Sequence, residues 1–170
     1  LEHVSLRGCA ITDAGVANLA YSASDNLGLT LSPGLTDRAL ELIVECSRLR
    51  TLDLISSPFT SEGLGRLAGL PLRDLTLGHP GLDGRAVASL PRTLERLSLR
   101  AGQAMTARDL HGLAELVSLR ELTLSSATHV DDAVVEDSHG CHTSSGWIEE
   151  APNLTDRSVL ALSTAPALRQ

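Results

Sequence analysis

The chain has 170 residues, of which 42% are hydrophobic and only 2% aromatic, and its 14 basic and 21 acidic side chains give a net charge of −7. This composition argues against nucleic-acid binding, which needs a clustered positive surface and, for single strands, aromatic rings on which bases stack. We also expect no membrane span, because no apolar run approaches about 20 residues.

One spacing of apolar residues recurs along the chain. It opens as Leu1-x-x-Val4-x-Leu6 and predicts short strands in which alternate side chains face a core. It returns as Asn26-x-x-Leu29-x-Leu31, Leu49-x-x-Leu52-x-Leu54, Leu72-x-x-Leu75-x-Leu77, Leu94-x-x-Leu97-x-Leu99 and Leu119-x-x-Leu122-x-Leu124. The repeated units therefore start near residues 1, 26, 49, 72, 94, 119 and 144, and the last of them is degenerate.

A second pattern follows each predicted strand. Every unit has a residue suited to capping a helix N-terminus, namely Thr12, Thr36, Thr60, Asp83, Thr106, Asp131 and Thr155. Four residues later comes an aliphatic side chain, namely Val16, Leu40, Leu64, Val87, Leu110, Val135 and Val159. This spacing predicts a short helix with one apolar face in each unit, and hence an α/β fold.

The segments that follow the pattern most fully are Leu1-x-x-Val4-x-Leu6-x-x-Cys9-x-x-Thr12-Asp13-x-Gly15-Val16, Leu35-Thr-Asp-Arg-Ala-Leu40, Cys46-x-x-Leu49-x-x-Leu52-x-Leu54 and Asn153-Leu-Thr-Asp-Arg-Ser-Val159. In these segments the chain resembles the cysteine-containing leucine-rich repeats of F-box proteins and related bacterial proteins. The resemblance implies a right-handed solenoid, or horseshoe, with short parallel strands on the concave face and helices on the convex face. Residues 1–170 are then a single domain of about seven repeats and a fragment of a longer solenoid.

Repeat solenoids offer an extended surface for binding. The resemblance implies protein recognition, for example as the target-binding part of a ubiquitin-ligase adaptor or a bacterial effector. The alternative is a sensory or regulatory repeat region of a larger signalling protein. We expect neither an enzyme nor a cofactor, because no nucleophile, base or phosphate-binding loop stands at a recognisable spacing.

The partner is expected on the concave sheet. The central strand positions read Ser5, Thr30, Asp53, Thr76, Ser98 and Thr123, which form a stripe of small hydroxyls interrupted by one carboxylate. Charged residues surround this stripe, and arginine is frequent among the residues that dominate interface energies. The predicted partner-binding residues are Arg50, Asp53, Arg73, Asp74, Arg96, Arg100 and Arg120. The alternative is that these side chains only form solvated salt bridges of small net value.

The three cysteines, Cys9, Cys46 and Cys141, are widely spaced. They do not form a disulfide framework of the kind found in secreted domains, so we expect buried, reduced thiols and a cytoplasmic location.

Residues 136–152 depart from the repeat. Three hypotheses are open for this interval: an irregular loop, a frameshifted repeat, and a zinc site built from His139, Cys141 and His142. The zinc site lacks a fourth protein ligand, and no metal is expected. We predict that the strand near 144–149 is missing or distorted, because Ser144, Trp147 and Glu149 replace its leucines.

Overall fold

The structure is a computed structural model that describes residues 3–20, 25–30, 32–79, 82–101, 113, 115–125 and 145–149. The strands are β1 (His3–Arg7), β2 (Asn26–Thr30), β3 (Thr51–Ile55), β4 (Asp74–His79), β5 (Arg96–Ala101), β6 (Glu121–Ser125) and β7 (Ser145–Glu149). The helices are α1 (Asp13–Ala20), α2 (Asp37–Ile43), α3 (Ser61–Gly65) and α4 (Gly84–Ala88), and a 3₁₀-helix, η1 (Arg66–Gly69), follows α3. The predicted alternation of strands and helices in an α/β fold is confirmed.

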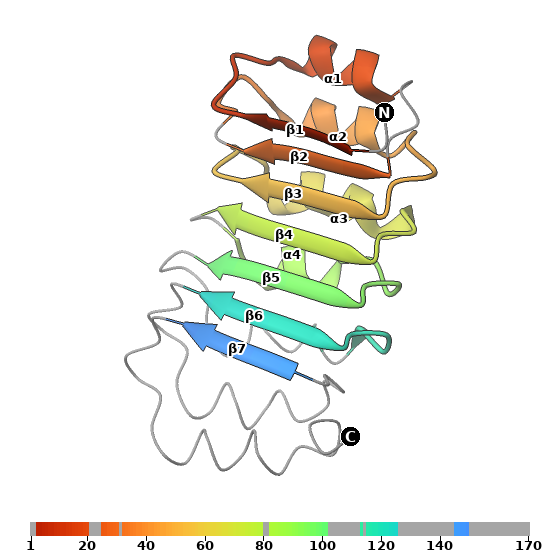
Figure 1. The fold of residues 1–170 in the computed structure, drawn as a ribbon, viewed down its shortest axis with the longest axis vertical. Helices are drawn as coiled ribbons and strands as arrows, with labels where there is room; N and C mark the ends of the chain where they lie inside the picture. Colours follow the sequence, from red (N-terminus) through yellow and green to blue (C-terminus); the bar gives the residue numbers. More distant parts are fainter. Residues whose placement is uncertain are drawn as a thin grey trace.

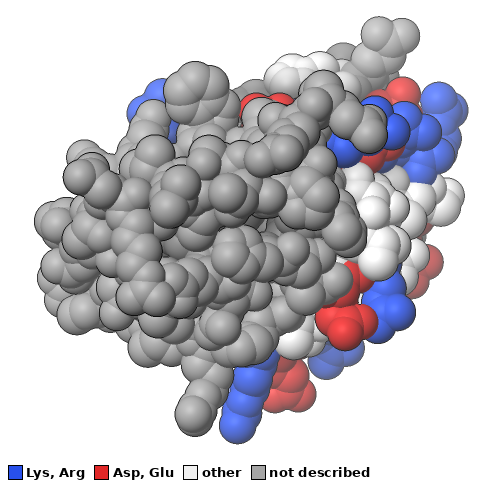
Figure 2. All heavy atoms as spheres, turned by 90° about the horizontal axis from the view of Figure 1, so that it is seen from below, with Lys and Arg blue, Asp and Glu red and all other residues white. Residues whose placement is uncertain are grey.

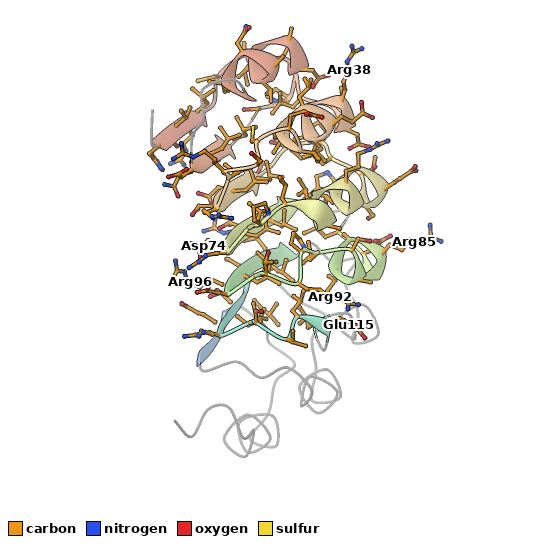
Figure 3. All side chains as sticks on the ribbon, turned by 90° about the vertical axis from the view of Figure 1, so that its right-hand side faces the viewer. Arg38, Asp74, Arg85, Arg92, Arg96 and Glu115 are labelled. Carbon is orange, nitrogen blue, oxygen red and sulfur yellow. The ribbon has the colours of Figure 1, made fainter. Side chains whose placement is uncertain are left out.

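All strands in the described part of the chain belong to one parallel sheet with the order β1-β2-β3-β4-β5-β6-β7. Helices α1 to α4 lie behind this sheet in Figure 1 and to the right of it in Figure 3, so they cover the same face. A parallel connection must return the chain to the start of the next strand, and the helices supply that return. Among the described residues, no helix is long and apolar enough to cross a bilayer.

The core is a slab between the sheet and the helices. Each strand sends two alternate apolar side chains into it, and the rows match across the sheet, as in Leu52–Leu75–Leu97. The buried strand residues include Leu27, Leu29, Leu52, Leu54, Leu75, Leu77, Leu97, Leu99 and Leu124. The helices contribute Val16, Leu40, Leu64 and Val87, the aliphatic positions that the sequence predicts. One repeated spacing therefore fills a continuous core.

The register of β2 corrects one prediction. Leu27 and Leu29 pair with Val4 and Leu6, and Gly28 lies opposite Ser5. The sequence analysis placed the strand two residues later and put Thr30 at the central position. Leu27, Leu29 and Leu31 alternate without a break, so registers two residues apart present equally apolar inner faces, and the leucine pattern does not distinguish them.

Strand β7 corrects a second prediction. Residues 145–149 form a strand in register with β6, where a missing or distorted strand was expected. Gly146 and Ile148 lie opposite the inward residues Leu122 and Leu124, and Trp147 lies opposite Thr123. The predicted alignment was one residue out of step, which exchanges the two faces of a strand. The hypotheses for residues 136–144 and 150–152 concern positions outside the described residues.

The predicted helix caps are present wherever the structure describes them. Thr36 and Thr60 accept hydrogen bonds from the backbone N–H groups of Arg38 and Gly63, and Asp83 accepts from Arg85 and Ala86. Thr12 directly precedes α1 and its carbonyl accepts from Val16. Thr106, Asp131 and Thr155 lie outside the described residues. Each cap satisfies first-turn amides that have no partner within the helix.

Side chains at the helix N-termini also join neighbouring units, which the sequence analysis did not predict. The Asp13 carboxylate accepts from the Thr36 backbone N–H at 2.9 Å and from its hydroxyl at 2.7 Å. One unit further on, Asp37 accepts the same two hydrogen bonds from Thr60, and Ser61 donates to Asp83. We call Asp13, Thr36, Asp37, Thr60, Ser61 and Asp83 the N-cap ladder. It ties each helix start to the next.

The ladder predicts a pH dependence at Asp83. The hydrogen bond from Ser61 lowers the pKa of Asp83, and the Ala86 and Arg85 amides and the Arg85 charge act in the same direction against partial burial. A lowered folded-state pKa gives stability that is present above the unfolded pKa of about 3.9 and is lost as the pH falls through the folded value. We expect an Asp83→Asn variant to be less stable than the wild type at pH 6, and the difference to shrink as the pH falls toward 2. Urea midpoints across that range test this, and a constant difference would contradict it.

Candidate functional site

The sheet face opposite the helices carries the outward side chains of the strands. Across β3 to β6, two rows of paired residues run side by side. The first row is Thr51, Asp74, Arg96 and Glu121, and the second row is Asp53, Thr76, Ser98 and Thr123. These eight residues line a groove of about 340 Å³ whose lining also includes Leu75 and Leu97. We call this the sheet groove.

The groove owes its shape to the size of its side chains. Thr76, Ser98 and Thr123 are small, and they stand at consecutive positions of the second row. Larger charged side chains in the first row rise beside them, which leaves a channel over the hydroxyls. The hydroxyls are partly exposed and can donate and accept hydrogen bonds. The groove therefore offers polar contacts along the stacking direction of the sheet.

A bidentate ion pair organises the first row. Arg96 Nη2 donates to Asp74 Oδ2 at 2.7 Å, and Arg96 Nε lies 2.5 Å from Asp74 Oδ1. Thr51 donates its hydroxyl to the same Asp74 oxygen, Oδ2, at 3.3 Å. The hydrogen bond to Asp74 raises the pKa of Arg96, and the charges of Asp74, Glu121 and Glu95 act in the same direction. Figure 3 shows Asp74 and Arg96 next to each other on the sheet side of the molecule.

Another line of charged residues stands directly before the strands. Backbone hydrogen bonds connect Arg50 to Arg73, Arg73 to Glu95, and Glu95 to Arg120 across neighbouring units. The Arg73 guanidinium lies 3.5 Å from the Glu95 carboxylate, and Arg50 donates to the carbonyl of Pro71 at 2.9 Å. These side chains border the groove at the N-terminal ends of the strands.

The structure divides the predicted partner-binding residues into three places. Asp53, Asp74 and Arg96 line the sheet groove. Arg50, Arg73 and Arg120 stand before the strands, and Arg100 lies in β5 beside Gly78, toward the opposite ends of the strands. Only Asp74 and Arg96 of this set form an ion pair among the described residues.

Two groove residues, Thr51 and Glu121, were absent from the predicted set. Each stands in the same register row as Asp74 and Arg96, one strand away from one of them. The signal that finds them is their position directly before the first inward leucine of the strand, at Leu52 and Leu122. The predicted middle position Thr30 is not in the groove, because Gly28 takes its place in the row.

Charge is mixed over the described surface. Figure 2 shows acidic and basic side chains next to each other wherever described atoms are visible. Helix-side and loop ion pairs join Arg66 to Glu41 at 3.2 Å and Arg92 to Glu115 at 2.9 Å. The groove differs from this average, because it holds three carboxylates and one guanidinium, a net charge of −3 + 1 = −2.

The cysteines only partly match the prediction. Cys9 and Cys46 are free thiols, but Cys9 is exposed and Cys46 is half-buried. Cys9 Sγ lies 3.5 Å from the carbonyl oxygen of Arg7, so it meets backbone in the turn without entering the core. Burial and the Glu45 charge raise the pKa of Cys46, which lowers the reactivity of its thiol at neutral pH. Cys141 lies outside the described residues.

Within the described ranges, no group of three or more His, Cys, Asp or Glu side chains is arranged to hold a metal ion. The candidate zinc ligands His139, Cys141 and His142 lie outside those ranges.

The sequence matches no protein-family model, and a search of curated proteins gives no match.

Proposed function

We propose that the chain is a right-handed leucine-rich-repeat solenoid that recognises a protein partner on the sheet face opposite its helices. The parallel sheet, with helices on one face and a leucine spacing repeated from β1 to β6, supports the architecture. In this proposal the sheet face is the concave one. The free thiols of Cys9 and Cys46 support a reducing compartment such as the cytoplasm.

The sheet groove is the observation that carries the function. It joins side chains from four consecutive strands into one polar channel, a geometry suited to an extended segment of another protein. Arg96 stands at its centre, and the side chains of Arg73 and Glu95 border it. Arginine is among the residue types that dominate binding energy, and its planar fork suits carboxylates and backbone carbonyls of a partner.

Charge reversal tests this proposal. Peptides selected on the wild-type chain from a random display library should lose at least about tenfold in affinity for the double variant Arg73→Glu with Arg96→Glu, since lost charged contacts can cost about 2–5 kcal/mol. The matched control is Arg38→Glu with Arg85→Glu, because both arginines are exposed on helices and point away from the sheet in Figure 3. The control should bind as the wild type does.

Folding is monitored in the same experiment by circular dichroism. If the glutamate variant melts at a lower temperature than the wild type, Arg73→Gln with Arg96→Gln replaces it, because glutamine adds no charge beside Asp74 and Glu121. Equal loss of binding in the sheet and helix variants, or loss in the helix variant alone, would overturn the assignment of the sheet face.

A further inference from the structure

The charges inside the sheet groove are unevenly compensated. Arg96 is its one cation, and both of its short contacts go to Asp74. Glu121 lies next to Arg96 in the first row and interacts with it electrostatically without a short contact. The three side chains together therefore keep a net charge of −1 at the β6 end of the row.

Asp53 supplies the second negative charge. It is partly buried in the lining of the groove, in the second row, opposite Gly28 and Thr76. Within the described part of the chain, its carboxylate makes no hydrogen bond or ion pair, so its charge is compensated by solvent alone. A partly desolvated carboxylate without a cation favours binding of one.

The distance between the two negative charges sets a spacing. Asp53 stands on β3 and Glu121 on β6, three strand intervals apart. With strands about 4.8 Å apart, the two positions are separated by roughly 14 Å along the stack. An extended peptide rises about 3.3 Å per residue and turns alternate side chains to the same side, so residues i and i+4 span about 13 Å on one face. The two lengths agree.

We propose that the sheet groove binds an extended segment of a partner protein with basic side chains at positions i and i+4. One Lys or Arg contacts Asp53, and the other contacts Glu121. The hydroxyls of Thr76, Ser98 and Thr123 stand between these anchors and bond the peptide backbone or small polar side chains. This inference rests on the proposed function and specifies the chemistry of the partner.

The borders of the groove suggest the opposite charge preference and make the inference testable. Arg50, Arg73 and Arg120 stand before the strands. Arg73 already has Glu95 as a partner, and Arg50 donates to a backbone carbonyl. If these arginines dominated recognition, the preferred peptides would be acidic. The groove itself predicts basic ones.

The experiment analyses the peptides selected on the full 170-residue chain from a random display library. Sequences with Lys or Arg four positions apart should be enriched over those with spacings of two or six. A synthetic peptide with Arg at i and i+4 should bind more tightly than an isomer with Arg at i and i+2. Raising the salt concentration should weaken both, because exposed charge pairs are screened.

Two double variants complete the test. Asp53→Asn with Glu121→Gln removes both anchors with little change of shape, and we expect the i,i+4 peptide to lose about tenfold in affinity, the product of two modest charge pairs. Glu45→Gln with Glu62→Gln removes two exposed carboxylates that do not line the groove and should leave binding unchanged.

The outcomes separate this inference from the proposed function. Selected peptides that are acidic or lack the spacing, yet still compete for the sheet face, would overturn the basic anchors and leave the recognition surface in place. Selected peptides that bind the Arg73→Glu, Arg96→Glu variant as well as the wild type, or a selection without binders, would overturn both.

Discussion

Replacing Leu75 or Leu97 by alanine should destabilise the fold by about 2–5 kcal/mol, because a buried leucine removed from a close-packed core leaves a cavity. Both side chains are only 2% exposed, and they pair across β4 and β5 in the row that also contains Leu52. In a chain of stacked units, each unit is stabilised mainly by its two neighbours, so a cavity in a central unit weakens the interfaces on both sides.

Urea denaturation followed by circular dichroism measures this effect. The matched control is Val117→Ala, which also removes apolar carbon atoms but from a side chain that is 74% exposed. The control should change the free energy of unfolding by less than about 0.5 kcal/mol. If both leucine variants unfolded at the wild-type midpoint, the central leucine row would not be the core of the protein.

The repeated leucines predict the inward faces of β3 to β6 residue by residue. At Leu52, Leu75, Leu97 and Leu122 a leucine stands three residues before the first inward position, and polar or charged residues separate the strand leucines, so only one register buries the apolar set. Where the pattern is ambiguous the prediction is wrong. Leu31 extends the alternation at β2, and in residues 144–149 the side chains Trp147 and Ile148 are both apolar.

The candidate site is predictable only in part for a different reason. Sequence position tells which strand residues face away from the core, and this places Asp53, Asp74 and Arg96 on the same face. It does not tell which charged side chains meet across strands, because that depends on the relative register of neighbours. Arg96 pairs with Asp74, and Arg73 with Glu95, since the residues before the strands form a line of their own.

The N-cap ladder was missed because it needs two units at once. Thr36 and Thr60 are recognisable as caps from the local sequence. Their contacts with Asp13 and Asp37 span 23 residues, and nothing local distinguishes these carboxylates from ordinary acidic residues in a first helical turn. A signal does exist in hindsight: the Thr-Asp pair repeats at 12–13 and 36–37, one unit apart.

The ladder leads to a test in which the same substitution has opposite effects in two backgrounds. A Cβ atom added to Gly63 would overlap the Asp37 carboxylate and displace it from the two hydrogen bonds with Thr60. Hydrogen bonds to a charged acceptor contribute about 1.5–3 kcal/mol each when lost without replacement, although exposure to solvent reduces this here. We therefore expect Gly63→Ala to destabilise the wild type by about 1–2 kcal/mol, net of the higher helix propensity of alanine.

In an Asp37→Ala background, the overlap and the two hydrogen bonds are already gone. Gly63→Ala should then stabilise the chain by up to about 1 kcal/mol, because only the backbone-entropy advantage of alanine within α3 remains. The four unfolding free energies form a double-mutant cycle whose coupling energy reports the contact between the two positions. Gly69→Ala supplies the control, since no described atom lies within 4 Å of its added Cβ, and its effect should be the same in both backgrounds. A Gly63→Ala effect of the same sign and size in both backgrounds would show that Asp37 does not hold Thr60 in solution, and that the helix starts are capped within each unit alone.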